Sequence, residues 1–201
     1  MTVRALAQVS AHGARSATKQ TTDEELVASI AAGNRIAMQV LYGRHHVRVY
    51  RFVLGMIRNE ATAEDVVSET FFDVWQQAGR FEGRSKVSTW LMSIARHKAL
   101  TALRGRQHDD ITDYAETMAD QADTPETTMQ KTDKSALLRE ALEQLTPAHR
   151  EIINLVYYHE KKIEEVATIL DIPLNTVKTR MHYARKRLAE ILEQSGFAEA
   201  V

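Results

Sequence analysis

Apolar side chains recur at helical spacing along most of the chain, most clearly in two segments near its C-terminal end. In the first segment, Ile163, Val166 and Leu170 share one side of a helix. Pro173 ends this helix, because proline disfavours helical backbone in the preceding residue and has no amide hydrogen to donate. A helix-turn-helix is therefore predicted over residues 163–188. The apolar stripe of its second helix is Leu174, Val177, Met181, Ala184 and Leu188.

The polar side of the second helix is basic, whereas the first helix carries acids. Between Leu174 and Leu188 there are five Lys or Arg residues and no Asp or Glu, while Glu164 and Glu165 lie in the first helix. A basic helix face is often only a solvated surface, so a helix that binds nothing is the alternative. The absence of acids from one helix alone favours binding in the DNA major groove. The candidate contact residues are Asn175, Thr176, Lys178, Thr179, Arg180, His182, Arg185 and Lys186.

The N-terminal half of the chain predicts three more amphipathic helices. Thr22 and the acids that follow it suit the start of a helix that buries Leu26. A second helix is expected over about residues 35–58. The break after it ends at Thr62, which is expected to cap a third helix with Asp65 three residues further on.

One aromatic residue of the third helix falls on its polar side. Val67, Phe71 and Val74 form the apolar side, whereas Phe72 lies among carboxylates. A ring surrounded by acids is typical of a protein–protein contact. The alternative is a wider apolar stripe that buries Phe72. The candidate contact residues on this face are Asp65, Glu69, Phe72 and Gln76.

A basic loop and a basic helix come next. Residues 81–87 combine small and cationic side chains with an aromatic ring at Phe81, and Ser88 is expected to cap the helix that follows. From Arg84 to Arg106 there are six Lys or Arg residues and no acid. Cations near aromatic rings are typical of proteins that bind single-stranded nucleic acid. The residues expected to project outward from this helix are Arg96, His97, Lys98 and Arg104.

The stretch at 107–133 predicts a flexible acidic linker, since Asp109 to Glu126 contains seven acids and no Lys or Arg. Helical periodicity returns at Lys134, and Thr146 with Pro147 suits the first turn of a later helix. The core side of that helix is expected to hold Ile152, Ile153, Leu155, Val156 and Tyr157.

The predicted fold is all-α, with two small helical domains joined by the linker. The first domain is expected at 22–106 and the second at 134–195, with a disordered tail at 1–21 and a short tail at 196–201.

Composition narrows the possible functions. The 201 residues include 44% hydrophobic residues, only three prolines and no cysteine, which excludes disulfides and fits a reducing cytoplasm. No apolar run reaches the roughly 20 residues that cross a bilayer, so membrane insertion is not expected. His45 and His46 face different sides of a helix, so no metal or other cofactor is predicted. With a net charge of −1, the chain should bind DNA weakly on its own.

The order of these segments resembles the bacterial sigma factors of the sigma-70 family, specifically the extracytoplasmic-function (ECF) group. The stretch from Ala63 through Phe71 and Trp75, together with the basic loop and helix after it, is similar to region 2 of that family. The stretch around Leu145, and residues 172–180, are similar to region 4. The resemblance covers about residues 22–192.

This resemblance implies a cytoplasmic factor without catalytic residues that serves a stress response. It would bind RNA polymerase core, at the β′ clamp coiled coil and the β flap, and promoter DNA, and an anti-sigma factor would inhibit it. The acidic face with Asp65, Glu69, Phe72 and Gln76 would contact the polymerase, and the helix-turn-helix residues would read the −35 element. The residues implied at the −10 element are Phe81, Gly83, Arg84, Ser85, Lys86, Trp90, Arg96, His97, Lys98 and Arg104.

Two other functions compete with this interpretation. A sigma-like decoy would occupy an anti-sigma factor without binding DNA, and would not need the basic faces. A stand-alone helix-turn-helix repressor would leave the first domain unexplained. An enzyme is the least favoured class, because the chain contains neither a glycine-rich phosphate loop nor a His-Glu-x-x-His motif.

Overall fold

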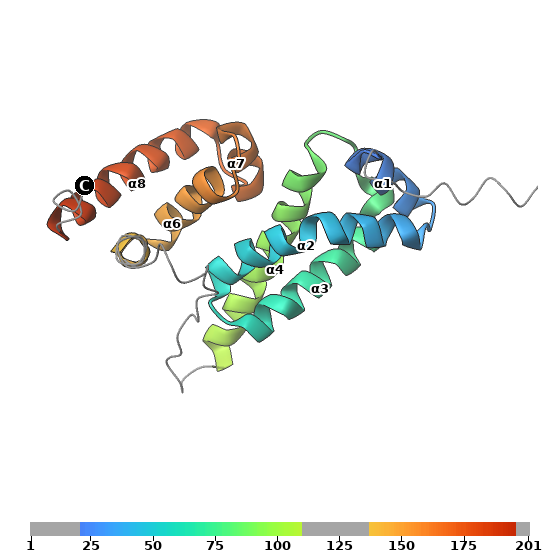
Figure 1. Ribbon diagram of the computed structural model, residues 1–201, viewed down its shortest axis with the longest axis horizontal. Coiled ribbons are helices and arrows are strands. Elements are labelled where there is room, and N and C mark those ends of the chain that lie inside the picture. The colour runs from blue at the N-terminus through green and yellow to red at the C-terminus, as the bar shows by residue number, and fades with distance from the viewer. Residues whose placement is uncertain (1–20, 110–136, 196–201) are drawn as a thin grey trace, which may run out of the picture.

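A computed structural model describes residues 21–109 and 137–195, and every regular element in these two parts is helical (Figure 1). The all-α prediction is confirmed. The elements are α1 (Asp23–Ala31), α2 (Arg35–Ile57), α3 (Glu60–Gln77), a 3-10 turn (Ala78–Arg80), α4 (Val87–Asp109), a helix at 137–143, α6 (Pro147–Ile153), a π-helical turn (Asn154–Tyr158), α7 (Ile163–Leu170) and α8 (Leu174–Gln194).

The predicted tails and most of the predicted linker lie outside the described residues. The linker was expected to begin at residue 107, and α4 extends to Asp109.

The first domain packs α1 to α4 around one core (Figure 1). Its long helices α2, α3 and α4 lie side by side, and α1 covers one end of the group. Buried residues from all four helices meet there, including Leu26, Leu41, Phe71 and Leu91. His45 is also buried, with its Nε2 2.6 Å from an Asp23 carboxylate oxygen, so this histidine joins α2 to α1.

Helix starts in this domain follow the predicted chemistry, with two corrections. Thr22 and Glu25 form a reciprocal capping box at α1, as expected. The cap of α3 is Asn59 rather than Thr62, because the Asn59 side chain accepts hydrogen bonds from both the backbone and the hydroxyl of Thr62 and so adds a turn. Similarly, the expected cap Ser88 lies inside α4, because the helix already begins at Val87.

The second described part of the chain, residues 137–195, contains the predicted helix-turn-helix. Asp171 adopts a left-handed conformation after α7, with φ of 51°, and α8 starts at Leu174. Val166, Ile169 and Leu170 of α7 pack in the core with the stripe on α8.

The prediction that Tyr157 lies in the core is wrong. Asn154–Tyr158 forms a π-helical turn, in which the His159 amide donates to the Asn154 carbonyl five residues back. The extra residue per turn shifts the buried face, so Leu155 is buried whereas Tyr157 is 57% exposed.

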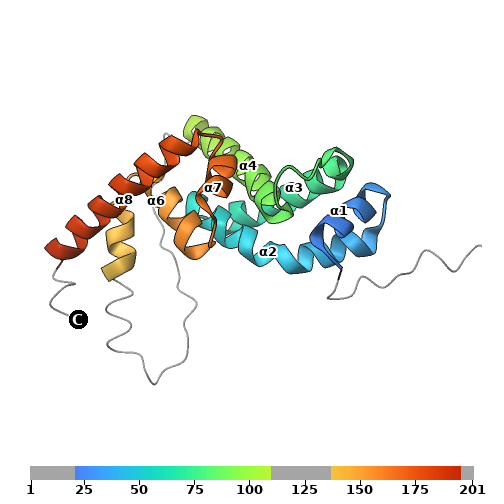
Figure 2. The same cartoon turned by 90° about the horizontal axis from the view of Figure 1, so that it is seen from above.

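The two domains lie against each other, with α7 beside α4 (Figure 2). Phe52 of α2 and Met92 of α4 are buried with the core residues of the second domain. Within the described residues, no helix combines the length and apolar character needed to span a bilayer. The same part of the chain brings together no group of three or more metal-ligating side chains.

Candidate protein- and DNA-binding surfaces

The acidic face of α3 is open to solvent. Residues 65, 69, 72 and 76 are spaced by four, three and four positions, which places them along one side of the helix. Phe72 is 60% exposed, while the neighbouring Phe71 is buried in the core. The alternative of a wider apolar stripe that buries Phe72 is therefore wrong. Asp65, Glu69 and Gln76 are exposed beside the ring, so α3 presents an apolar side chain within an acidic surface.

The loop between the 3-10 turn and α4 is anchored by two aromatic rings. The ring centroids of Phe81 and Trp90 are 4.9 Å apart, and both residues pack against the core of the first domain. Between them, Gly83 has a φ of 70°, which side-chain-bearing residues rarely adopt. Arg84 extends into solvent and pairs with Glu82, and Ser85 is half-buried.

The four cationic or titratable residues expected to project outward from α4 have different surroundings. His97 and Arg104 are exposed. Lys98 lies between Asp73 at 3.0 Å and Glu69 at 3.4 Å. Burial opposes the charged form of Lys98, but its bonds to these acids outweigh that effect and raise the Lys98 pKa.

Arg96 is held by a residue of the second domain. Its Nε donates to Glu151 Oε1 at 2.7 Å and its Nη2 to Glu151 Oε2 at 3.3 Å. Both arms of the guanidinium fork are used, and the side chains are only 20% and 13% exposed. The structure thus brings Arg96 together with a carboxylate 55 residues away, a pairing that no local sequence signal indicates.

The domain contact contains a second polar cluster, centred on Glu165 of α7. Glu165 accepts a hydrogen bond from the Thr89 hydroxyl at 3.1 Å and pairs with Lys86 at 3.3 Å. Burial would raise the Glu165 pKa, but the hydrogen bonds from the Lys162 backbone, Thr89 and Lys86 outweigh it and lower the pKa. Nearby, Lys161 donates to the Ser88 hydroxyl at 2.8 Å.

A buried histidine lies at the same contact. The His159 ring packs edge-on against Phe52 of the first domain, with centroids 5.5 Å apart. Burial lowers the His159 pKa to about 4, and the nearby charges of Arg48, Lys161 and Arg51 act in the same direction. The imidazole is therefore neutral near pH 7.

The helix-turn-helix exposes most of the residues predicted to contact DNA. Val177, Met181 and Ala184 hold α8 against the rest of the domain, which turns the opposite side of the helix outward. Thr176 and Arg180 are partly covered by neighbouring residues. The members of the predicted set that are exposed to solvent are Asn175, Lys178, Thr179, His182, Arg185 and Lys186.

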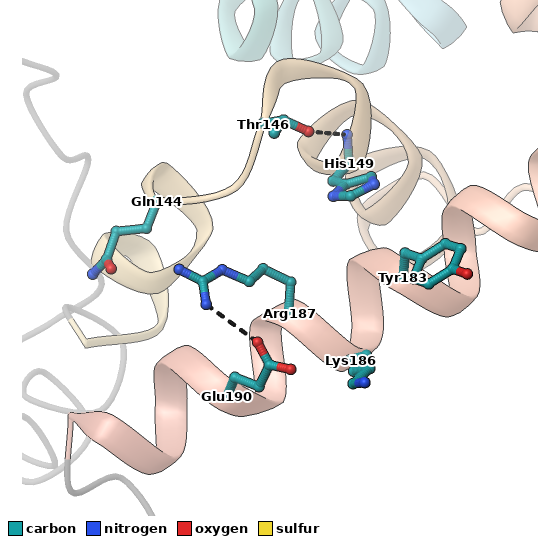
Figure 3. Close-up of a pocket in the computed structure, with 7 residues that line it drawn as sticks. All are labelled: Gln144, Thr146, His149, Tyr183, Lys186, Arg187 and Glu190. Carbon is teal, nitrogen blue, oxygen red and sulfur yellow. Dashed lines mark hydrogen bonds and ion pairs between the residues drawn. The ribbon is translucent and has the colours of Figure 1, made fainter.

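A shallow hollow of about 470 Å³ lies where the middle of α8 faces the start of α6 (Figure 3). Lys186 lines it, and Arg187 pairs with Glu190 at 3.2 Å on the same helix. Arg187 was not among the residues that the sequence singled out on this helix. The full lining is Gln144, Thr146, His149, Tyr183, Lys186, Arg187 and Glu190.

Comparison with known proteins assigns both domains. The family description "Sigma-70 region 2" matches residues 41–108, and "Sigma-70, region 4" matches residues 135–188. RNA polymerase sigma factor CarQ of Myxococcus xanthus is 34% identical over 160 residues, which cover 80% of this chain and 91% of that protein. ECF RNA polymerase sigma factor SigL of Mycobacterium tuberculosis is 31% identical over 175 residues, covering 85% of this chain and 97% of SigL.

Solved structures agree on the fold. CnrH, in complex with the cytosolic domain of CnrY, is 23% identical with a TM-score of 0.64 and covers 86% of this chain and 97% of its own. The sigma factor RpoE of Bartonella quintana, in complex with the anti-sigma factor NepR, is 24% identical with a TM-score of 0.62. The match covers 77% of this chain and 96% of the RpoE chain. Because both domains and the relatives give the same answer, the chain belongs to the extracytoplasmic-function sigma factors of the sigma-70 family.

Proposed function

We propose that this chain is an alternative sigma factor that binds RNA polymerase core and directs transcription from specific promoters. The observation that carries the proposal is the division of surfaces between the domains. The first domain exposes Phe72 within an acidic face, and the second exposes a basic helix in a helix-turn-helix. Family membership over both domains supports the same function.

The acidic face of α3 is the proposed polymerase contact. Phe72 supplies an apolar anchor, and Asp65, Glu69 and Gln76 supply the polar rim that surrounds such anchors at protein interfaces. The partner surface is the β′ clamp coiled coil, while the second domain lies near the β flap.

The loop and α4 are the proposed reader of the −10 element. Flipping a base out of the non-template strand costs a few kcal/mol of unstacking. A site that accepts only one kind of flipped base therefore both melts the DNA duplex and selects the promoter sequence. The half-buried Phe81 and Trp90 rings give the loop a rigid base, and Gly83 and Ser85 leave room beside them. The cationic and titratable side chains near the strand are Arg84, Lys86, Arg96, His97, Lys98 and Arg104.

The exposed side of α8 is the proposed reader of the −35 element. Its first turns carry Asn175, Thr176, Lys178, Thr179 and Arg180, the part of a recognition helix that meets base edges in the major groove. His182, Arg185 and Lys186 follow along the helix and meet phosphates. The protein performs no covalent chemistry, acts in the cytoplasm and is held inactive by an anti-sigma factor.

Transcription with purified components tests this function. The chain is added to sigma-free core polymerase on fragmented DNA of its own genome, and the 5′ ends of the transcripts are mapped. We expect new start sites that share sequence elements centred near −10 and −35 and that are absent with core alone.

The absence of new start sites would reject the proposal and leave the decoy, which binds an anti-sigma factor without DNA. A stand-alone repressor would instead bind duplex DNA tightly without polymerase, which a salt-titrated binding assay detects. The exposed cations of α8 support DNA binding over the decoy.

A further inference from the structure

Two buried titratable side chains lie in the short segment between the π-helical turn and α7. His159 is only 5% exposed and Lys161 only 6%. The Lys161 ammonium donates to the Ser88 hydroxyl at 2.8 Å, but no carboxylate of the described residues forms an ion pair with it. A lysine is rarely buried unless an anion balances its charge. Lys161 is therefore an unusual cation for the interior of a protein.

The acid nearest in charge, Glu165, is engaged by other groups. It accepts a hydrogen bond from the Thr89 hydroxyl at 3.1 Å and from the Lys162 amide at 3.0 Å, and it pairs with Lys86 at 3.3 Å. Burial lowers the Lys161 pKa, and the opposing charge of Glu165 does not outweigh this effect. The charge of Lys161 is thus left to be balanced by another anion.

Two arginines of α2 lie beside the same segment. Phe52 packs on His159 with ring centroids 5.5 Å apart, and Arg48 is one turn before Phe52 on the same side of the helix. The charges of both Arg48 and Arg51 contribute to the lowered His159 pKa, which shows that both guanidiniums are near that ring. Both arginines are exposed, and neither pairs with another side chain in the described parts of the chain. Two unpaired guanidiniums therefore accompany the buried ammonium of Lys161.

Three positive charges close together suit a compact anion that carries several negative charges. Side chains three positions apart on a helix have Cβ atoms about 5–6 Å apart, so two arginines at this spacing can reach one ligand. Each guanidinium fork can bind two phosphate oxygens, and an ammonium adds a point charge. An extended acidic peptide fits less well, because its carboxylates on one side are about 7 Å apart.

We propose that Arg48, Arg51 and Lys161 form a binding site for a small polyphosphate anion, held between α2 and the segment before α7. The ring contact between Phe52 and His159 fixes the two elements that carry these cations relative to each other. The site is independent of the proposed function, because it includes no residue that we assign to polymerase or to promoter DNA.

Titration calorimetry of the full chain with sodium pyrophosphate tests the site, without divalent cations and at about 0.15 M salt. Arg48→Gln/Arg51→Gln should weaken binding by about tenfold or more, because charge-assisted hydrogen bonds from two guanidiniums are lost. The matched control is Arg35→Gln/Arg80→Gln, which removes two arginines from exposed positions of the same domain and should bind as the wild type does. Equal affinity of the two double variants would overturn the proposal.

Lys161→Met separates a binding role from a structural one. Methionine keeps an unbranched apolar stem and removes the buried charge, so the variant should fold. At a pyrophosphate concentration of about one hundred times Kd, the wild type should unfold about 5 °C or more higher than without the anion. Lys161→Met should show little of this shift. Because the shift is measured within each protein, a change in the starting stability cannot imitate the result, and equal shifts would contradict the assignment of Lys161.

Three ligands distinguish the sources of phosphate. Pyrophosphate and metal-free ATP should both depend on Arg48 and Arg51, and the tighter of the two identifies an inorganic or a nucleotide ligand. The third ligand is a labelled oligothymidine of about 20 nucleotides. If Arg48→Gln/Arg51→Gln changes only oligothymidine binding, the cluster contacts nucleic acid and the proposal fails. It fails too if pyrophosphate binding is lost in Lys178→Gln/Arg185→Gln instead, since the anion then binds on α8.

Discussion

Phe71 and Phe72 are adjacent in sequence and differ completely in environment. Phe71 is buried, while Phe72 is 60% exposed among acids. Local periodicity favoured this difference, because consecutive helical residues are about 100° apart around the axis, and the exposure of Phe72 decides it against a wider buried stripe.

This difference leads to a prediction at Phe72. Phe72→Ala should weaken binding to core polymerase by about 2 kcal/mol, as truncation of an interface anchor does. The free energy of unfolding should change by less than about 0.5 kcal/mol, because little buried area is lost. The control is Phe71→Ala, which should destabilise the fold by roughly 3–5 kcal/mol. Titration calorimetry and urea unfolding measure the two quantities. A lowered melting temperature in Phe72→Ala with normal core binding would contradict the assignment.

His159 makes stability depend on pH. Its pKa is about 4 in the folded protein against 6.5 for an unperturbed histidine, so the unfolded chain binds more protons between these values. Stability is therefore fully present above pH 6.5 and falls as pH drops toward 4. From pH 7 to pH 5, this one group should remove about 2 kcal/mol.

In urea unfolding at the two pH values, His159→Gln should lack most of this difference. The exposed His182 provides the control, and His182→Gln should keep the wild-type pH dependence. An unchanged pH dependence in His159→Gln would mean that other groups set the acid response.

At the scale of single residues, the sequence predicted which side of a helix a residue faces better than it predicted which residue it contacts. Spacing favoured an outward position for Phe72 and left a wider buried stripe as the alternative, which its 60% exposure excludes. Tyr157 was misplaced because a π-helical turn shifts the register without a proline or glycine to signal it. Arg96 was expected to project outward from α4, but its side chain is only 20% exposed because Glu151 of the second domain holds it. This partner could not be identified from the sequence, since the contact depends on how two separate domains dock.

At the scale of elements, helix starts were predictable where only one cap was available. Thr22 and Thr146 accept the expected backbone hydrogen bonds. At α3, both Asn59 and Thr62 could cap, and the structure uses Asn59, which lengthens the helix by a turn. At α4, the Ser88 hydroxyl accepts from Lys161 of the other domain. The starts of α3 and α4 were therefore predicted wrongly because, in each case, a second hydrogen-bonding partner was available.

Arg150 of α6 connects two elements of the second domain. Its guanidinium donates to the carbonyls of Leu142, Glu143 and Leu145, so one side chain satisfies the end of the preceding helix and the turn after it. Burial lowers the Arg150 pKa, with the charge of Arg58 adding to the effect.

Replacement of this arginine should destabilise the domain. Arg150→Lys keeps the charge but cannot present a planar fork to three carbonyls, and we expect a loss of roughly 1.5–3 kcal/mol in urea unfolding. The control is Arg185→Lys on the exposed side of α8, which should be neutral for stability. Equal stability of both variants would show that water replaces the three bonds.

The recognition helix α8 should be separable from polymerase binding. Replacing both Lys178 and Arg180 with alanine should weaken promoter use by about 1–3 kcal/mol for each side chain that reads a base. Core binding, which we assign to α3, should remain. Promoter-specific transcription and a core-binding assay are measured in parallel, and loss of core binding in the double variant would show that the surfaces are misassigned.

For the molecule as a whole, charge layout carried more information than net charge. The chain is nearly neutral at −1, yet the α8 stretch from Leu174 to Leu188 contains five Lys or Arg residues and no acid. That segregation, together with two apolar patterns, was sufficient to predict two helical domains. The docking of α7 on α4 could not be predicted, because the sequences of both helices show only an ordinary amphipathic pattern.

Phe52 and Met92 belong to the first domain by sequence but are buried in the core of the second. When the domains part, both side chains meet water, and the second domain loses part of its own interior. Separating the domains therefore exposes apolar surface and costs free energy, which ties the stability of the second domain to its contact with the first.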